Sequence, residues 1–393
     1  MPSLRLVAVL LLAALVVGGC GREINTDDDA PPALLGPPDR SRANLGYPEL
    51  ATKNTTRVPG SNPTAIAAAV VRGVYPDPAR KPDAITLVDR GDWRVAVAAS
   101  ALMAAPFNAP MLLTDGTDIP SATQNALDAL APEGSAAAGN AQVIRVGNVA
   151  TPAGLKSSDI KAGNALALTR SIAGLIRAAN RGKTIRVIVT SADAPDYGAP
   201  AAAYAAKSGN PVLFVTRTSV PPETRAALAA LAGLARPRIY VLGPSKIISP
   251  EVTQQLRRLG RVKRIGGQDP VTNAIGMARY KDGAFGWGAV DPGHGMVFTR
   301  TGRPLDAAAA APLSGSGKYG SLLLLDNGAT LPQAVQQYLL DIQPGYQEDP
   351  VRGVYSHGWI VGNRDLVSVA QQARIDALLE IVPVRTPDAP PLP

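Results

Sequence analysis

Short apolar segments alternate with Ala-rich segments along most of the chain. In one stretch, Ile185–Thr190 has the length and β-branched content of a buried strand, and the Ala-rich segment Ala199–Lys207 predicts the helix that follows it. A second predicted strand covers Val212–Thr216, Pro221 and the residues after it open another helix, and Arg238–Leu242 is a third strand. Apolar strands that alternate with helices are typical of parallel sheets covered on both faces, so we expect an α/β fold.

The same order of elements occurs three times. Each copy carries an Asp in the loop after its first strand, and these residues, Asp92, Asp196 and Asp306, are 104 and 110 residues apart. Solenoid repeats have periods of only about 20–50 residues. The sequence therefore predicts three tandem Rossmann-like units with parallel sheets flanked by helices, at 57–160, 161–264 and 265–384.

The third unit differs by two long loops, 283–295 and 343–358. Nine of the 17 aromatic residues lie between Tyr280 and Trp359. Loops of this length in compact domains are often functional. Their aromatic side chains are suited to stacking on sugar rings and equally to packing at an interface between units.

The N-terminus predicts export and lipid attachment. Arg5 and the apolar run Leu6–Val17 resemble a signal peptide over residues 1–19, and Gly18-Gly19-Cys20 resembles a bacterial lipobox, which implies acylation of Cys20. An ordinary secretory signal is the alternative, although Cys20 is the single cysteine and has no disulfide partner. Residues 20–56 lack an apolar period and predict a disordered tether, and 385–393 predict a tail.

The net charge of the chain indicates which class of binding partner to expect. The chain carries a formal net charge of +8. At the extracytoplasmic face of a membrane this argues against nucleic acid and favours anionic lipid headgroups or anionic polymers of the wall or envelope. General solubility explains the same charge, because the cations form no dense run.

The ordered motifs resemble the cell wall-binding repeat 2 family of bacterial surface proteins. The family's PDAL helix start is matched at Pro195-Asp196, its API-LLT strand at Ala109–Thr114 and Pro211–Thr216, and its unit-opening segment at Arg264–Ala274. Glycine ends the last strand of each copy at Gly147, Gly243 and Gly362, although the family's second glycine is missing. The resemblance covers 57–382. It implies three α/β units in a pseudo-threefold arrangement that attach non-covalently to an anionic cell wall polymer.

The resemblance also implies candidate contact residues. The family's leucine-rich strand is associated with attachment, and its counterparts here are Leu112, Leu113, Leu213, Phe214, Leu323 and Leu324. Their apolar character alone predicts buried strand core.

The charged candidates have two interpretations as well. Asp92, Asp196 and Asp306 lie where open α/β sheets bind ligands, and are able to accept sugar hydroxyls or hold a cation that bridges to phosphate. Equally, each is placed to act as a helix N-cap. Arg217 and Arg303 complement an anionic polymer.

Catalytic chemistry finds little support in the residues. His294 and His357 are the two histidines, and the lack of a second cysteine argues against a zinc site built on a Cys/His cluster. No G-x-S-x-G nucleophile motif occurs. We therefore predict no catalytic residues, metal or cofactor, and a lipid-anchored extracytoplasmic protein that binds an envelope polymer. The alternatives are an envelope scaffold that binds other proteins and an accessory factor of a wall hydrolase.

Overall fold

The computed structural model describes residues 50–183, 185–232, 236–315 and 320–384. The predicted signal peptide, Cys20, residues 21–49 of the predicted tether and the tail at 385–393 lie outside the described residues. Within these four ranges, no helix is both long and apolar enough to cross a membrane.

The first sheet is parallel throughout and has the strand order β4-β3-β5-β6. Its strands are β3 (Ile85–Asp89), β4 (Met111–Thr114), β5 (Val143–Val146) and β6 (Ser157–Ile160). Its helices are α3 (Trp93–Ala99), continued by η1 (Ser100–Met103), then α4 (Ser121–Leu130) and the short η2 (Ala136–Ala138).

The second sheet repeats this topology in the order β8-β7-β9-β10, again parallel. Its strands are β7 (Arg186–Ser191), β8 (Val212–Val215), β9 (Arg238–Leu242) and β10 (Arg261–Ile265). Its helices are α6 (Pro195–Ser208), α7 (Pro222–Leu231) and α8 (Pro250–Leu259).

The third sheet has the order β12-β11-β14-β2, with β1 added as an antiparallel edge strand. Its strands are β11 (Gly295–Arg300), β12 (Gly320–Leu325), β14 (His357–Val361), β2 (Thr55–Val58) and β1 (Leu50–Ala51). Its helices are α10 (Pro304–Gly315), α11 (Gln333–Asp341) and α12 (Val369–Leu378). The loop 343–358 carries β13 (Gly345–Tyr346) and η3 (Pro350–Arg352), and β13 pairs with β15 (Val382–Pro383).

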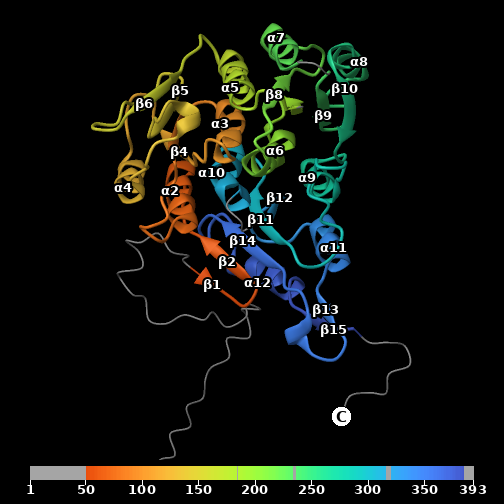
Figure 1. Ribbon diagram of the computed structural model, residues 1–393. Coiled ribbons are helices and arrows are strands. Elements are labelled where there is room, and N and C mark those ends of the chain that lie inside the picture. The colour runs from red at the N-terminus through yellow and green to blue at the C-terminus, as the bar shows by residue number, and fades with distance from the viewer. Residues whose placement is uncertain (1–49, 184, 233–235, 316–319, 385–393) are drawn as a thin grey trace, which may run out of the picture.

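The position of β2 corrects part of the predicted tether. Residues 50–56, which the sequence assigned to a disordered linker, form β1 and the first half of β2, and β2 pairs in parallel with β14. Figure 1 shows the red N-terminal strands directly beside the blue β14. The physical reason is that Thr55 and Arg57 are fully buried in the third sheet, a tertiary contact that the local sequence pattern does not reveal.

The three sheets are related in a cyclic manner. The last strand of each sheet leads into the first helix of the next copy: β6 completes the first sheet, β10 completes the second, and β2, from the start of the chain, completes the third. Each of these strands leads into a helix, and the three helices are α2 (Pro63–Val74), α5 (Ala165–Ala179) and α9 (Pro270–Arg279). Asn62, Asn164 and Asp269 cap them at equivalent positions. The predicted fold of three repeated parallel α/β units is confirmed.

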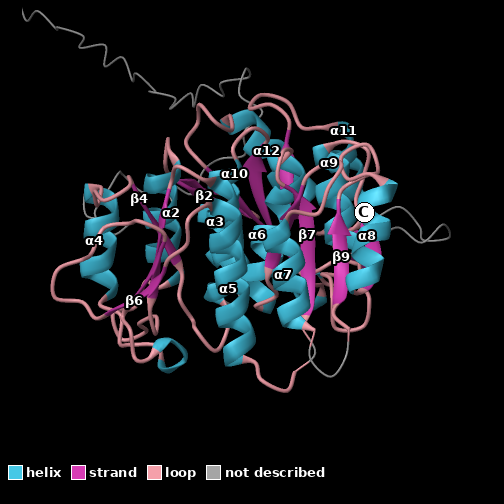
Figure 2. Cartoon of the chain, turned by 90° about the horizontal axis from the view of Figure 1, so that it is seen from above, coloured by secondary structure: helices cyan, strands magenta, loops and turns pink. Residues whose placement is uncertain are grey.

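Three Ala-rich helices, α3, α6 and α10, meet at the centre of the molecule. Ala96, Ala201 and Ala309 are fully buried there, and their small side chains allow the helix backbones to approach closely. In Figure 2 these helices lie in the middle, with α4 and β6 on one side and β9 and α8 on the other. Helices α2, α5 and α9 each contact one central helix and one outer helix. Helix α2 contacts α10 and α4, helix α5 contacts α3 and α7, and helix α9 contacts α6 and α11. The same set of contacts therefore occurs three times around the centre.

Candidate functional site

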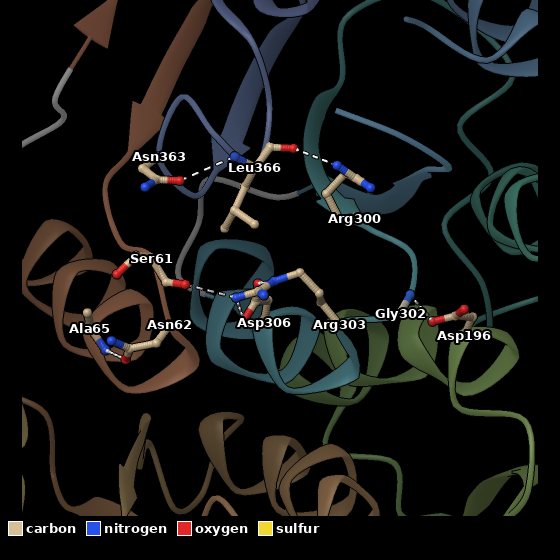
Figure 3. Close-up of polar contacts among 10 residues, drawn as sticks. All are labelled: Ser61, Asn62, Ala65, Asp196, Arg300, Gly302, Arg303, Asp306, Asn363 and Leu366. Carbon is tan, nitrogen blue, oxygen red and sulfur yellow. Dashed lines mark hydrogen bonds and ion pairs between the residues drawn. The ribbon is translucent and has the colours of Figure 1, made fainter. Parts of the chain in front are cut away.

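The turns that lead into the central helices form an axial junction, made of residues 90–94, 191–196, 300–306 and 59–62. Arg94 donates from Nε to the carbonyl of Ala192 over 2.9 Å, which joins the first unit to the second. Asp196 accepts from the backbone N–H of Gly302 over 2.8 Å and joins the second unit to the third. Arg303 donates to the carbonyl of Ser61 over 3.2 Å, and so links the third unit to the segment before α2 (Figure 3).

The three predicted Asp residues lie in this junction but not at equivalent helix positions. Asp92 is the N-cap of α3 and accepts from the backbone N–H of Arg94 over 2.8 Å. Asp196 is already the second residue of α6, and its carboxylate bonds to the next unit rather than to its own helix. Burial raises the pKa of Asp196, while the hydrogen bond from Gly302 acts in the opposite direction.

Asp306 is the third residue of α10 and is 2% exposed. Its carboxylate pairs with the guanidinium of Arg303. Burial raises the pKa of Asp306 and outweighs the opposing effect of Arg303. Asp306 and Arg303 thus serve the joint between units in this structure, and neither presents a freely accessible charge.

The six apolar candidates are core residues. They lie on β4, β8 and β12, the strands at one end of the three equivalent sheets, and each is at most 1% exposed: Leu112, Leu113, Leu213, Phe214, Leu323 and Leu324. A polymer at the surface does not reach these side chains. Any contribution that they make to attachment is indirect, through the stability of the sheets.

Sequence reasoning missed an arginine that fixes the glycine turn after the third strand; it is fully buried in the third unit and partly buried in the second. In the second unit Arg264 on β10 donates to the carbonyls of Gly243 (2.6 Å) and Ile248 (2.8 Å). In the third unit Arg57 on β2 donates to the carbonyls of Gly362 (2.9 Å) and Asn363 (3.0 Å). The two arginines occupy the same register, each paired with the residue two positions before the glycine.

In the first unit the arginine that bonds to the carbonyls of the glycine turn lies on the neighbouring strand, β5. Asp159 on β6 stands at the arginine position, opposite Arg145 on β5. Arg145 pairs with Asp159 over 2.8 Å and donates from Nε to the carbonyl of Ala150 over 2.9 Å. The exchange accounts for the missing arginine in the first copy: the unit-opening motif is clearest at Arg264–Ala274, recognisable at Arg57–Ala65 and weak near Gly163.

Exposed cations lie in the loops that follow the carboxyl ends of the strands. We call the loops 115–119, 161–163, 216–220, 243–249, 326–331 and 362–367 the strand-end face. Arg217, Lys246 and Arg364 are exposed in these loops, and within the described residues none of them has an ion-pair partner. In the first unit, by contrast, Lys161 pairs with Asp159 over 3.1 Å. The second and third units therefore offer the accessible positive charge.

This arrangement of three sheets occurs in solved structures. Cwp6 from Clostridium difficile matches with a TM-score of 0.64 over 82% of this chain and 48% of its own length, at 16% sequence identity. The chain shares its fold. Cwp8 from the same organism matches with a TM-score of 0.61 over 84% of this chain and 52% of its own length, also at 16% identity.

The likeness is one of fold, and the chain spans about half the length of each of these two proteins. No protein-family model matches the sequence. No curated protein matches it either. The function proposed below therefore rests mainly on the positions and charges of this chain's own residues.

Proposed function

We propose that this protein binds an anionic polymer of the bacterial cell envelope through its strand-end face, without catalysing a reaction. The supporting observation is the set of exposed cations: Lys246 and Arg364 lie in the equivalent loops after β9 and β14, and Arg217 lies in the loop after β8. Cwp6 and Cwp8, which have the same fold, are cell wall proteins. We further propose that acylated Cys20 holds the protein at the extracytoplasmic face of a membrane.

Several weak contacts on one rigid body are sufficient for such attachment. An exposed ion pair contributes only about 0.2–1 kcal/mol. A polymer with regularly spaced anionic groups engages several such sites at once, and each site after the first then binds intramolecularly at a high effective concentration. The bonds of the axial junction, from Arg94, Asp196 and Arg303, keep the units in fixed relative positions, as this mode of binding requires.

The test is retention of the unacylated protein on purified cell envelope. We expect the triple variant Arg217→Glu, Lys246→Glu and Arg364→Glu to lose about 3 kcal/mol of binding free energy, at about 1 kcal/mol per reversed charge, or roughly 100-fold in affinity. The matched control reverses three exposed arginines on helices α5, α8 and α12, namely Arg170, Arg258 and Arg374.

The control variant has the same net charge as the test variant, so general electrostatic attraction affects both equally. Retention that falls in the test variant alone, and that high salt abolishes in the unmodified protein, supports the proposal. Equal retention of the two variants contradicts it.

A scaffold that recruits envelope proteins is the second candidate. Apolar side chains are exposed on the third-unit loops, with exposed fractions of 79% for Val351, 55% for Tyr355 and 58% for Val290. Such side chains are typical of protein interaction sites when they are contiguous. Retention that resists high salt, and that protease treatment of the envelope abolishes, favours the scaffold.

A further inference from the structure

The loop 283–295 joins two units through its aromatic residues. Phe285 is fully buried and stacks on Tyr240 with ring centroids 3.5 Å apart. The hydroxyl of Tyr204 accepts from the N–H of Gly286 over 2.7 Å, which fixes the loop to the second unit. In the third unit, the hydroxyl of Tyr338 donates to the carbonyl of Ala289 over 2.9 Å. The predicted interface role therefore fits Phe285, but it leaves Trp287 unexplained.

Trp287 lines a cavity of about 800 Å³ at the amino ends of β11, β12 and β14. This is the edge of the third sheet opposite to the strand-end face. The volume lies within the range of about 300–1,000 Å³ that is typical of small-molecule sites. Gly295 and Gly320, which pair across β11 and β12, line the cavity and add no side-chain bulk.

Two further aromatic rings line the same cavity. His357 and Trp359 are two residues apart on β14, so their side chains project from the same face of the sheet. Their ring centroids are 5.4 Å apart in an edge-to-face arrangement. Both side chains are partly exposed, whereas Ile360 beside them is buried. A strand of the third unit and the loop 283–295 thus present indole rings to one cavity.

The charge of the cavity is positive. Lys207, in the last turn of α6, places its ammonium 4.5 Å from the centre of the Trp287 ring. Burial and the nearby charge of Lys281 lower the pKa of Lys207. Among the described residues that line the cavity, none is Asp or Glu. An anionic ligand therefore meets the Lys207 ammonium and no carboxylate among the lining residues, while the lining His294 is paired with Asp291, which lies outside the lining.

Trp287 also has an unused hydrogen-bond donor. Its indole N–H is buried and has no hydrogen-bond partner within the part of the chain that the structure describes. A buried donor without a partner costs free energy, but solvent does not reach this nitrogen, so the indole N–H is not counted among the ligand contacts.

We propose that this cavity binds an acidic saccharide unit, with a sugar ring against Trp287 or Trp359 and its carboxylate or phosphate at Lys207. The apolar C–H face of a pyranose ring removes indole surface from water on contact. The charge-assisted bond to Lys207 then selects acidic over neutral sugars. This inference deepens the proposed function, because it names acidic sugar units as the part of the polymer that the protein recognises, but it uses a different edge of the molecule.

The test is titration of the purified protein with glucuronic acid, glucose 6-phosphate and glucose, followed by tryptophan fluorescence. We expect saturable changes with one or both acidic sugars and binding of glucose that is at least tenfold weaker. The difference between the two acids distinguishes a carboxylate from a phosphate ligand. Lys207→Gln should reduce acid binding about tenfold and abolish the preference over glucose, and Trp287→Phe should weaken binding of the acids and glucose alike.

The control is Trp93→Phe, because Trp93 packs on Phe214 and Arg94 outside this cavity. It should leave all affinities unchanged, and circular dichroism should show that every variant is folded. Absence of saturable binding by both acids, equal affinity for glucose, or unchanged affinity in folded Lys207→Gln overturns the inference. The triple strand-end variant should retain sugar binding while it loses envelope retention. If the unmodified protein binds the acidic sugars but is not retained on the envelope, only the proposed function is contradicted.

Discussion

Arg57→Met tests the closure of the third sheet by the N-terminal strand. The side chain of Arg57 is fully buried, and its guanidinium donates to Gln372 (2.9 Å) and to the carbonyls of Gly362 (2.9 Å) and Asn363 (3.0 Å). Methionine keeps an unbranched apolar side chain but removes the charge and every donor. Each buried acceptor that loses its donor and stays unpaired costs about 1–3 kcal/mol, and Arg57→Met leaves three such acceptors.

We therefore expect the unfolding free energy to fall by about 4 kcal/mol, a large part of the roughly 5–15 kcal/mol that is typical of a native protein. Urea unfolding followed by far-ultraviolet circular dichroism measures the change in midpoint and slope. Limited proteolysis with mass spectrometry adds a local measurement, because cleavage before residue 60 should become faster when β2 leaves the sheet.

The control for charge and side-chain size is Arg80→Met, at an exposed loop position, where about 0.5 kcal/mol or less is expected. Arg264→Met removes the equivalent contact in the second unit and should cost less than Arg57→Met, because Arg264 is only partly buried and water is able to reach the groups that it leaves. If Arg57→Met is no more destabilising than Arg80→Met, the reasoning about sheet closure is refuted.

Three further predictions concern the junction and the turns. Asp196→Ala removes the acceptor for the Gly302 N–H and should lower the unfolding free energy, measured by urea unfolding, by about 1–2 kcal/mol. Asp196→Asn keeps an acceptor oxygen and should lower it by less, so equal losses in the two variants would contradict the role of this bond. Burial raises the pKa of Asp306 from 3.8, so the folded state retains a proton that the unfolded state releases. Stability should consequently fall as pH rises through the interval just above 3.8, and Asp306→Asn should flatten that slope in unfolding curves between pH 3.5 and 6. Gly60 has φ +143°, and a Cβ there would lie 2.9 Å from the backbone nitrogen of Ile66. Gly60→Ala should lower the thermal midpoint and cost about 2 kcal/mol; an unchanged midpoint would count against the strain.

The elements that the sequence predicted well are those with a strong local pattern. The run 185–190 has the length and β-branched content of a strand, and the segment after it is rich in the helix former Ala; they appear as β7 and α6. The burial of Leu213 and Phe214 also follows from their apolar character alone, whereas the family resemblance had suggested a contact role.

The features that the sequence did not predict depend on distant partners. Thr55–Val58 becomes a strand because β14 offers it a parallel edge, and nothing in its own four residues specifies that partner. Asp196 has an acidic residue's preference for a helix start, but its actual acceptor role was set by the approach of Gly302 from the next unit. The cavity beside Trp287 likewise combines α6, β14 and a loop, which are far apart in sequence.

The cyclic exchange of opening strands fixes the order in which the molecule is completed. The first and second sheets take their fourth strands from the segments that follow them, β6 and β10, so each closes soon after its own unit emerges. The third sheet instead waits for two segments separated by 305 residues between Arg57 and Gly362. Contacts between such distant segments form slowly, because the chain loses the conformational entropy of closing the loop before the contacts stabilise it. We therefore expect the pairing of β2 with β14 to be the last step of folding, and a chain that stops before β14 leaves β2 without the strand that it pairs with.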